Sequence, residues 1–195
     1  MRKTILAAAL GLSLLQLQGC VPLVATGAGA GVLMATDRRS SGVYIEDQEV
    51  ELRAANRTRD AFPADNVHVN FTSYNRAVLI TGEVPDETSK QKIDTIVMGV
   101  SSVKTTYNEL RIAPASLLSS RSNDAYITTK VKTRFFDAKR FPATAVKIVT
   151  ENGVVYLMGL VTQQEGADAA QIASTTSGVT KVVKLFDYIA KAPDA

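Results

Sequence analysis

The chain has 195 residues, a length that suits one ordinary domain or two small ones. It carries 22 Lys and Arg against 19 Asp and Glu, but two of the basic residues lie in a segment that we expect to be removed, which leaves 20 against 19. A nearly neutral protein lacks the basic excess of a nucleic-acid-binding domain, so the composition argues against a nucleic-acid partner.

Residues 1–19 have the layout of a bacterial secretion signal peptide, with two basic residues, an apolar run over 5–15 and a small-residue cleavage site. The apolar run is too short to span a bilayer. Cys20 follows directly and is the only cysteine, so an oxidising compartment would leave it without an intramolecular partner. The sequence Leu17-Gln18-Gly19-Cys20 resembles the lipobox of bacterial lipoproteins, departing from it at Gln18. We therefore predict that Cys20 carries a thioether-linked lipid.

Residues 20–43 are predicted to form a flexible tether, because they show no apolar alternation and include three glycines in five positions. Gly27, Gly29 and Gly31 superficially resemble a phosphate-binding loop, but no buried strand leads into them. The alternative to a free tether is an apolar hairpin lying against the membrane, which Pro22 and the glycines would permit.

An internal repeat fills the rest of the chain. Residues 69–84 align without a gap on 146–161, at an offset of 77, and each segment predicts two strands joined by a tight turn. Asn152-Gly153 is a hairpin signal because both residues accept positive φ, and Asn75 serves similarly in the first copy.

Two helices and a third strand complete each copy. Residues 47–60 align on 124–137 at the same offset and predict a helix before each hairpin, and apolar residues at helical spacing predict a second helix after it. The segments 103–112 and 182–189 are rich in β-branched and aromatic residues, which is typical of a strand. The predicted fold class is α/β (α+β), with the order helix, strand, strand, helix, strand in each copy and two helices covering a small three-stranded sheet.

The repeat resembles the BON domain (bacterial OsmY and nodulation), whose signature is a Val-x-Val strand, a glycine turn, a Val-x-Leu-x-Gly strand and a Gly-Val-x-x-Val ending. The second copy matches this signature at Val146, Ile148, Gly153, Val155, Leu157, Gly159, Gly178, Val179 and Val182. The first copy lacks the turn glycine, with Arg76 in its place. Two copies behind a lipobox resemble the dual BON-domain lipoproteins of the Gram-negative outer membrane. We predict BON domain 1 at 44–113, a linker at 114–121 and BON domain 2 at 122–191.

The sequence predicts neither a catalytic nor a metal site. His68 is the only histidine, and Val67 and Val69 flank it in a predicted strand, so we expect it to point away from the apolar pair into solvent. A Ser/His/Asp or Cys/His site would need this one histidine or the lipid-bearing cysteine. Acidic residues are scattered over helix faces and turns, where solvation explains them. We therefore expect a protein that is not an enzyme and uses no cofactor, no metal and no small-molecule substrate.

The two copies differ in charge and in their first helix. Residues 44–113 carry 8 basic and 11 acidic side chains, whereas residues 121–191 carry 10 and 6. Winding 124–137 at about 100° per residue places Ile127, Val131 and Phe135 on the core side. Aromatic and basic residues occupy or follow the opposite side, a pattern typical of a surface in a lipid headgroup region. The predicted lipid-binding residues are Tyr126, Thr129, Lys130, Lys132, Thr133, Phe136, Lys139 and Arg140.

The alternative is that Tyr126 and Phe136 pack against the other module or the linker, and that the lysines only keep this face soluble. The family resemblance implies that BON domain 2 binds anionic phospholipid at the periplasmic side of the outer membrane, supporting envelope integrity, also at division sites. The second function class is a protein-interaction adaptor that docks an envelope assembly machine such as the outer-membrane protein insertase. The expected partners are an anionic phospholipid membrane or this assembly machinery.

Overall fold

The computed structural model describes residues 37–62 and 67–192. They belong to one compact unit, Thr36–Ala195. The predicted signal peptide, Cys20 and most of the predicted tether lie outside the described residues.

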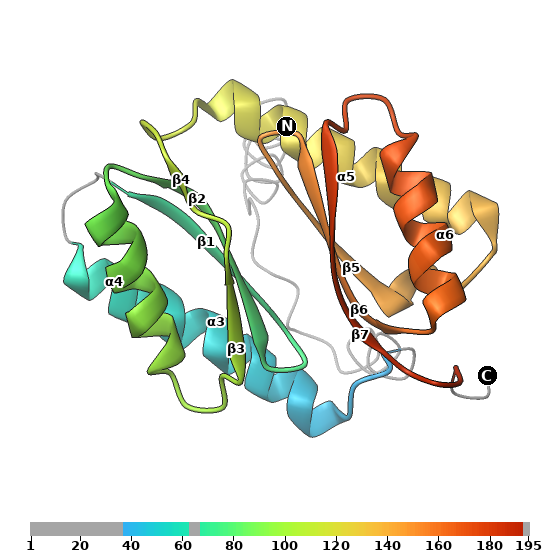
Figure 1. Ribbon diagram of the computed structural model, residues 1–195, viewed down its shortest axis with the longest axis horizontal. Helices are drawn as coiled ribbons and strands as arrows, with labels where there is room; N and C mark the ends of the chain where they lie inside the picture. The colour runs from blue at the N-terminus through green and yellow to red at the C-terminus, as the bar shows by residue number, and fades with distance from the viewer. Residues whose placement is uncertain (1–36, 63–66, 193–195) are drawn as a thin grey trace, which may run out of the picture. The chain divides into compact units, whose positions relative to one another are not determined.

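Module 1, residues 41–112, contains two helices and one sheet. Its elements are α3 (Ser41–Ala61), β1 (His68–Tyr74), β2 (Ala77–Val84), α4 (Glu87–Met98), β3 (Thr105–Asn108) and β4 (Arg111–Ile112). Strand β2 pairs antiparallel with β1 and parallel with β3 and β4. Both helices cover the same face of this sheet (Figure 1), where Val50 and Ala54 of α3 and Ile93 of α4 share one apolar core with β2.

Module 2, residues 118–188, repeats this arrangement. Its elements are α5 (Leu118–Ala138), the 3₁₀ turn η2 (Ala143–Ala145), β5 (Val146–Glu151), β6 (Val154–Val161), α6 (Gln163–Ser174) and β7 (Lys181–Tyr188). Strand β6 pairs antiparallel with β5 and parallel with β7. A second apolar core joins α5, α6 and the facing sheet. The predicted α/β class and the predicted element order are therefore confirmed.

Three boundaries differ from the sequence prediction. Helix α3 begins at Ser41, where Ser40 accepts a hydrogen bond from the Val43 N–H, and α5 begins at Leu118. The last residues of the predicted linker 114–121 are thus helical. The third strand of module 1 is interrupted, because Leu110 turns into the core and separates β3 from β4.

Both hairpin turns are held by an aspartate from the preceding helix. Asp47 accepts hydrogen bonds from the backbone N–H groups of Asn75 and Arg76, both at 2.8 Å. Asp124, at the offset of 77, does the same for Asn152 and Gly153, both at 2.9 Å. These bonds hold Arg76 at φ 68°, so the first turn forms without the family's glycine. The expectation that solvation explains the acidic residues is wrong for Asp47 and Asp124, which are both buried.

A third apolar core lies between the faces of the two sheets that the helices leave uncovered. It contains Tyr74, Ala77 and Leu79 of module 1 and Tyr156 and Met158 of module 2. All eight residues of β2 are consequently buried. Each sheet therefore has helices on one face and the other module on the second face.

The prediction of a solvated His68 is also wrong. The side chain does point away from Val69, as alternation requires, but this second face of the sheet is covered. Its exposed fraction is 17%, and Nδ1 lies 2.9 Å from Glu83 Oε2.

The end of the predicted tether is fixed to the folded unit. The Arg38 guanidinium donates two hydrogen bonds of 2.7 Å to the Glu165 carboxylate and a third of 2.8 Å to the Leu160 carbonyl. The Arg39 guanidinium bonds the buried Asp47 at 2.7 Å and stacks over the Tyr74 ring at 4.1 Å. Residues 38 and 39, which lie within the predicted tether 20–43, are thus bound to the folded unit.

Candidate functional site

The site is built on α5, whose inner side is anchored as predicted. Ile127, Val131 and Phe135 are at most 1% exposed and pack in the core of module 2. Their spacing fixes the rotation of the helix, and the predicted outer residues are therefore directed away from the core.

Two aromatic side chains stand out on this outer side. Tyr126 is 63% exposed and Phe136 is 62% exposed, although each has a large apolar area. The hydroxyls of Thr129 and Thr133 donate to the carbonyls of Ala125 and Thr129, at 2.9 and 3.0 Å. Because these hydroxyls are satisfied within the helix, they add little polarity to the surface between the aromatic residues.

A groove of about 540 Å³ runs between α5 and the segment that follows α6. It is lined by Tyr126, Thr129, Lys130, Thr133, Arg134, Thr175, Thr176 and Ser177. Lys130 Nζ lies 5.0 Å from the centre of the Tyr126 ring, a cation–π contact that holds the ammonium beside the aromatic surface. The groove thus combines an apolar wall, a cation and several hydroxyls.

Arg134 and residues 175–177 were not predicted. The Arg134 guanidinium donates to the Ile172 carbonyl at 2.9 Å and to the Thr176 hydroxyl at 2.7 Å, so it holds the end of α6 against α5. The repeat contains a signal for this role. Arg57, at the offset of 77, bonds the Gly99 carbonyl at the end of α4 at 2.7 Å.

Four of the predicted lipid-binding residues do not line the groove. Phe136 and Lys132 are exposed on α5 beyond it, and Lys139 ends the helix with φ 51°. Arg140 is directed to α6, where its guanidinium bonds Asp168 at 3.1 Å and Gln171 at 2.9 Å. The fold therefore brings together Tyr126, Thr129, Lys130 and Thr133, and it partly neutralises Arg140.

Module 1 presents a different surface at the equivalent helix. Glu49 occupies the position of Tyr126, and its carboxylate pairs with Arg53, the counterpart of Lys130, at 2.8 Å. This ion pair neutralises the Arg53 guanidinium, and Glu49 places a carboxylate where module 2 has an aromatic ring. Of these two helices, α5 alone combines exposed aromatic rings with a lysine that forms no ion pair within the described part of the chain.

No helix in the described ranges 37–62 and 67–192 is both long and apolar enough to cross a membrane.

The model of the BON domain matches residues 49–114 and 123–190. The chain therefore belongs to the BON-domain family, and the resemblance seen in the repeat is confirmed.

Relatives with known names extend this similarity over most of the chain. The outer membrane lipoprotein DolP of Haemophilus influenzae is 41% identical over 174 residues, which cover 89% of this chain and 90% of that protein. The 21 kDa hemolysin of Actinobacillus pleuropneumoniae is 32% identical over 154 residues, covering 78% and 79%. The osmotically-inducible protein Y of Escherichia coli is 22% identical over 160 residues, covering 80% of each. The chain is thus a DolP-like protein with two BON domains.

Proposed function

We propose that this protein is a non-catalytic lipoprotein, anchored through Cys20 in the outer membrane and facing the periplasm, that binds anionic phospholipid with the outer surface of α5. The observation that carries the proposal is the exposure of Tyr126 beside Lys130, and of Phe136 further along α5, because aromatic rings near a cation suit the boundary between headgroups and acyl chains. The 41% identity to an outer membrane lipoprotein supports the anchor and the location.

The α5 surface needs only a low intrinsic affinity for lipid. A basic residue near an anionic membrane contributes about 1 kcal/mol, and the anchor already keeps the protein at a high local concentration. The lipid on Cys20 would hold the protein at the membrane, and α5 would select the headgroup. By family resemblance, the resulting function is support of outer-membrane integrity, also at division sites.

Vesicle flotation of the unlipidated protein, residues 21–195, tests the lipid surface directly. Tyr126→Glu and Phe136→Glu should abolish binding to anionic vesicles, because each places a negative charge where an apolar ring enters the headgroups. Their melting temperatures should stay close to that of the parent, since the core residues of α5 remain. Leu52→Glu is the matched control, because Leu52 is also 62% exposed but lies on α3. Loss of binding only in proportion to a fall in melting temperature would contradict the proposal.

The anchor needs a separate test in cells. Cys20→Ala should release the protein from membranes in a high-salt wash while its modules still fold, because no described core residue depends on this cysteine. Unchanged membrane association would contradict lipid anchoring.

A second candidate function is that of an adaptor for an envelope assembly machine. It is favoured by Leu117 and Leu118, which are 75% and 77% exposed at the start of α5. Replacing both by Ser should abolish crosslinking to outer-membrane assembly proteins without changing vesicle flotation. Unchanged crosslinking would exclude this surface.

A further inference from the structure

Three metal-ligating side chains meet away from the α5 groove. His68 of β1, Glu83 of β2 and Glu151 of β5 each direct one ligand atom to a common place, and these atoms lie within 4.8 Å of one another. Glu83 is 3% exposed and Glu151 is 7% exposed, so both carboxylates are buried. Two converging buried carboxylates repel each other unless a cation or hydrogen bonds compensate their charge.

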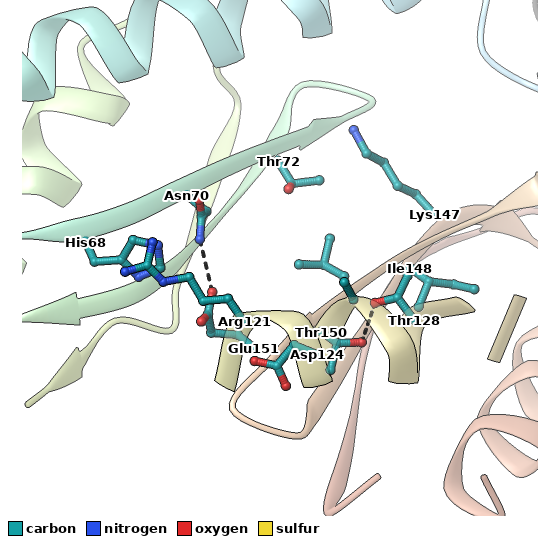
Figure 2. A pocket seen from close by; sticks show the side chains of 12 residues that line it. His68, Asn70, Thr72, Arg121, Asp124, Thr128, Lys147, Ile148, Thr150 and Glu151 are labelled. Atoms are coloured by element: carbon teal, nitrogen blue, oxygen red, sulfur yellow. Dashed lines mark hydrogen bonds between the residues drawn. The ribbon is translucent and has the colours of Figure 1, made fainter. Parts of the chain in front are cut away.

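Amides from the opposite module hold both carboxylates in position. Asn152 of module 2 donates to Glu83 Oε1 at 2.7 Å, and Asn70 of module 1 donates to Glu151 Oε2 at 3.1 Å, as Figure 2 shows for the second pair.

The cluster is open to solvent on one side. His68 and Glu151 line a cavity of about 560 Å³, together with Asn70 and Arg121 (Figure 2). Next to Glu83, the Ser116 backbone N–H donates to Oε2 at 3.1 Å, and the buried Ser116 hydroxyl has no hydrogen-bond partner within the part of the chain that the structure describes. The cavity thus has room for water beside His68 and Glu151.

We propose that His68, Glu83 and Glu151 bind one divalent transition-metal ion, with Zn²⁺ as the best match, and that this ion joins the two modules. Imidazole nitrogen and carboxylate oxygen are ordinary zinc ligands, and a water from the cavity would fill the fourth position. Tetrahedral zinc needs ligand atoms about 3.3 Å apart, so small side-chain rotations suffice.

Binding replaces the hydrogen bond between His68 and Glu83. The Nδ1 of His68 coordinates as the neutral imidazole with its proton on Nε2, and the Glu83 oxygen that now faces Nδ1 becomes a metal ligand. Asn70 and Asn152 then act as the outer shell that orients the carboxylates. This site was not predicted from the sequence, because Glu151 belongs to the other module and lies 83 residues after His68.

Residues 21–195, freed of any affinity tag and treated with chelator, are the material for the test. This protein lacks Cys20 and contains one histidine, so no thiol and no second imidazole competes for the ion. Calorimetric titration should show one Zn²⁺ per chain, and saturating zinc should raise the melting temperature by several degrees because the ion binds only the folded protein. Zinc should also shift the NMR signals of the single imidazole ring.

Variants identify the ligands. His68→Gln, Glu83→Gln and Glu151→Gln should each weaken zinc binding about tenfold or more and lose the thermal shift, whereas His68→Cys, which restores a zinc ligand, should bind again. Glu87→Gln, which removes an exposed carboxylate at the start of α4, is the matched control and should bind like the parent. Absence of saturable binding, an unshifted His68 ring, or unchanged binding in His68→Gln and Glu151→Gln would overturn the proposal.

Discussion

Asp124 determines the shape of the β5–β6 turn although it lies 28 residues before Asn152. Its buried carboxylate is the acceptor for two backbone N–H groups that β-sheet pairing leaves free. An unpaired buried N–H carries a desolvation penalty, and a hydrogen bond to a charged group is stronger than a neutral one. The aspartate thus couples the first helix of the module to its hairpin.

Asp124→Ala should lower the free energy of unfolding by roughly 2 to 4 kcal/mol, because both N–H groups lose a charged acceptor. Asp137→Ala, at the exposed end of the same helix, is the control and should change it little. Urea denaturation measures both. Equal effects of the two variants would show that the turn does not need its carboxylate.

The role of these aspartates in the turns was not predicted from the sequence. Asp47 and Asp124 mark equivalent helix positions in the repeat, and Asn75 and Asn152 mark the turns. Each aspartate reaches its turn because the helix packs across the sheet. This contact is long-range, so the spacing of residues along the chain does not predict it. The same reason explains why His68 was expected in solvent.

At the scale of the helix, α5 shows how far periodicity predicts a surface. A winding of about 100° per residue correctly separated the core residues from Tyr126, Thr129, Lys130 and Thr133. It could not predict the opposite wall of the groove, because residues 175–177 come from another element. It also gave no sign that Asp168 pairs with Arg140.

Lys130 and Arg140 should contribute differently to lipid binding, because only Arg140 is paired with a carboxylate in the described residues. Lys130→Ala should weaken binding to anionic vesicles about fivefold, which corresponds to about 1 kcal/mol, and the loss should shrink as salt rises. Arg140→Ala should have a smaller effect, because Asp168 already neutralises part of its charge. Vesicle flotation at two salt concentrations measures both. A larger loss for Arg140→Ala would refute this ranking.

The packing of the two modules on each other had a signal in the sequence that the repeat analysis did not use. Ala77-Val78-Leu79-Ile80 and Val154-Val155-Tyr156-Leu157-Met158 are continuous apolar runs, whereas a strand with one solvated face alternates. The structure buries both faces of β2, one under helices and the other against module 2. The repeat therefore predicted each module, whereas the continuous apolar runs indicate that the modules pack on each other.

The ion pair between Arg38 and Glu165 makes the attachment of the N-terminal segment dependent on pH. The hydrogen bonds from Arg38 lower the pKa of Glu165 to about 2, against an ordinary value of 4.5. A carboxylate with a depressed pKa stabilises the fold fully above its unfolded pKa and loses this contribution as the pH falls through the folded value.

The melting temperature of Glu165→Gln should therefore lie below that of the parent by a constant amount from pH 7 to about 5. The gap should narrow as the pH falls towards 2. Arg38→Gln should show the same profile, since it removes the same pair. A gap that persists to pH 2, or that is absent at pH 7, would contradict this assignment.

The contact at Arg38 also limits the length of the segment that joins Cys20 to the folded unit. Arg38 comes 18 residues after Cys20, and so short a segment spans at most about 60 Å when fully extended. A segment that reached the predicted domain boundary at residue 44 before it met the folded unit would extend roughly 20 Å further. If Cys20 carries the proposed lipid, a pull from the membrane reaches module 2 first, because Glu165 belongs to that module. The folded unit would then stay within about 60 Å of the membrane, and a partner further away would have to approach the membrane to meet it.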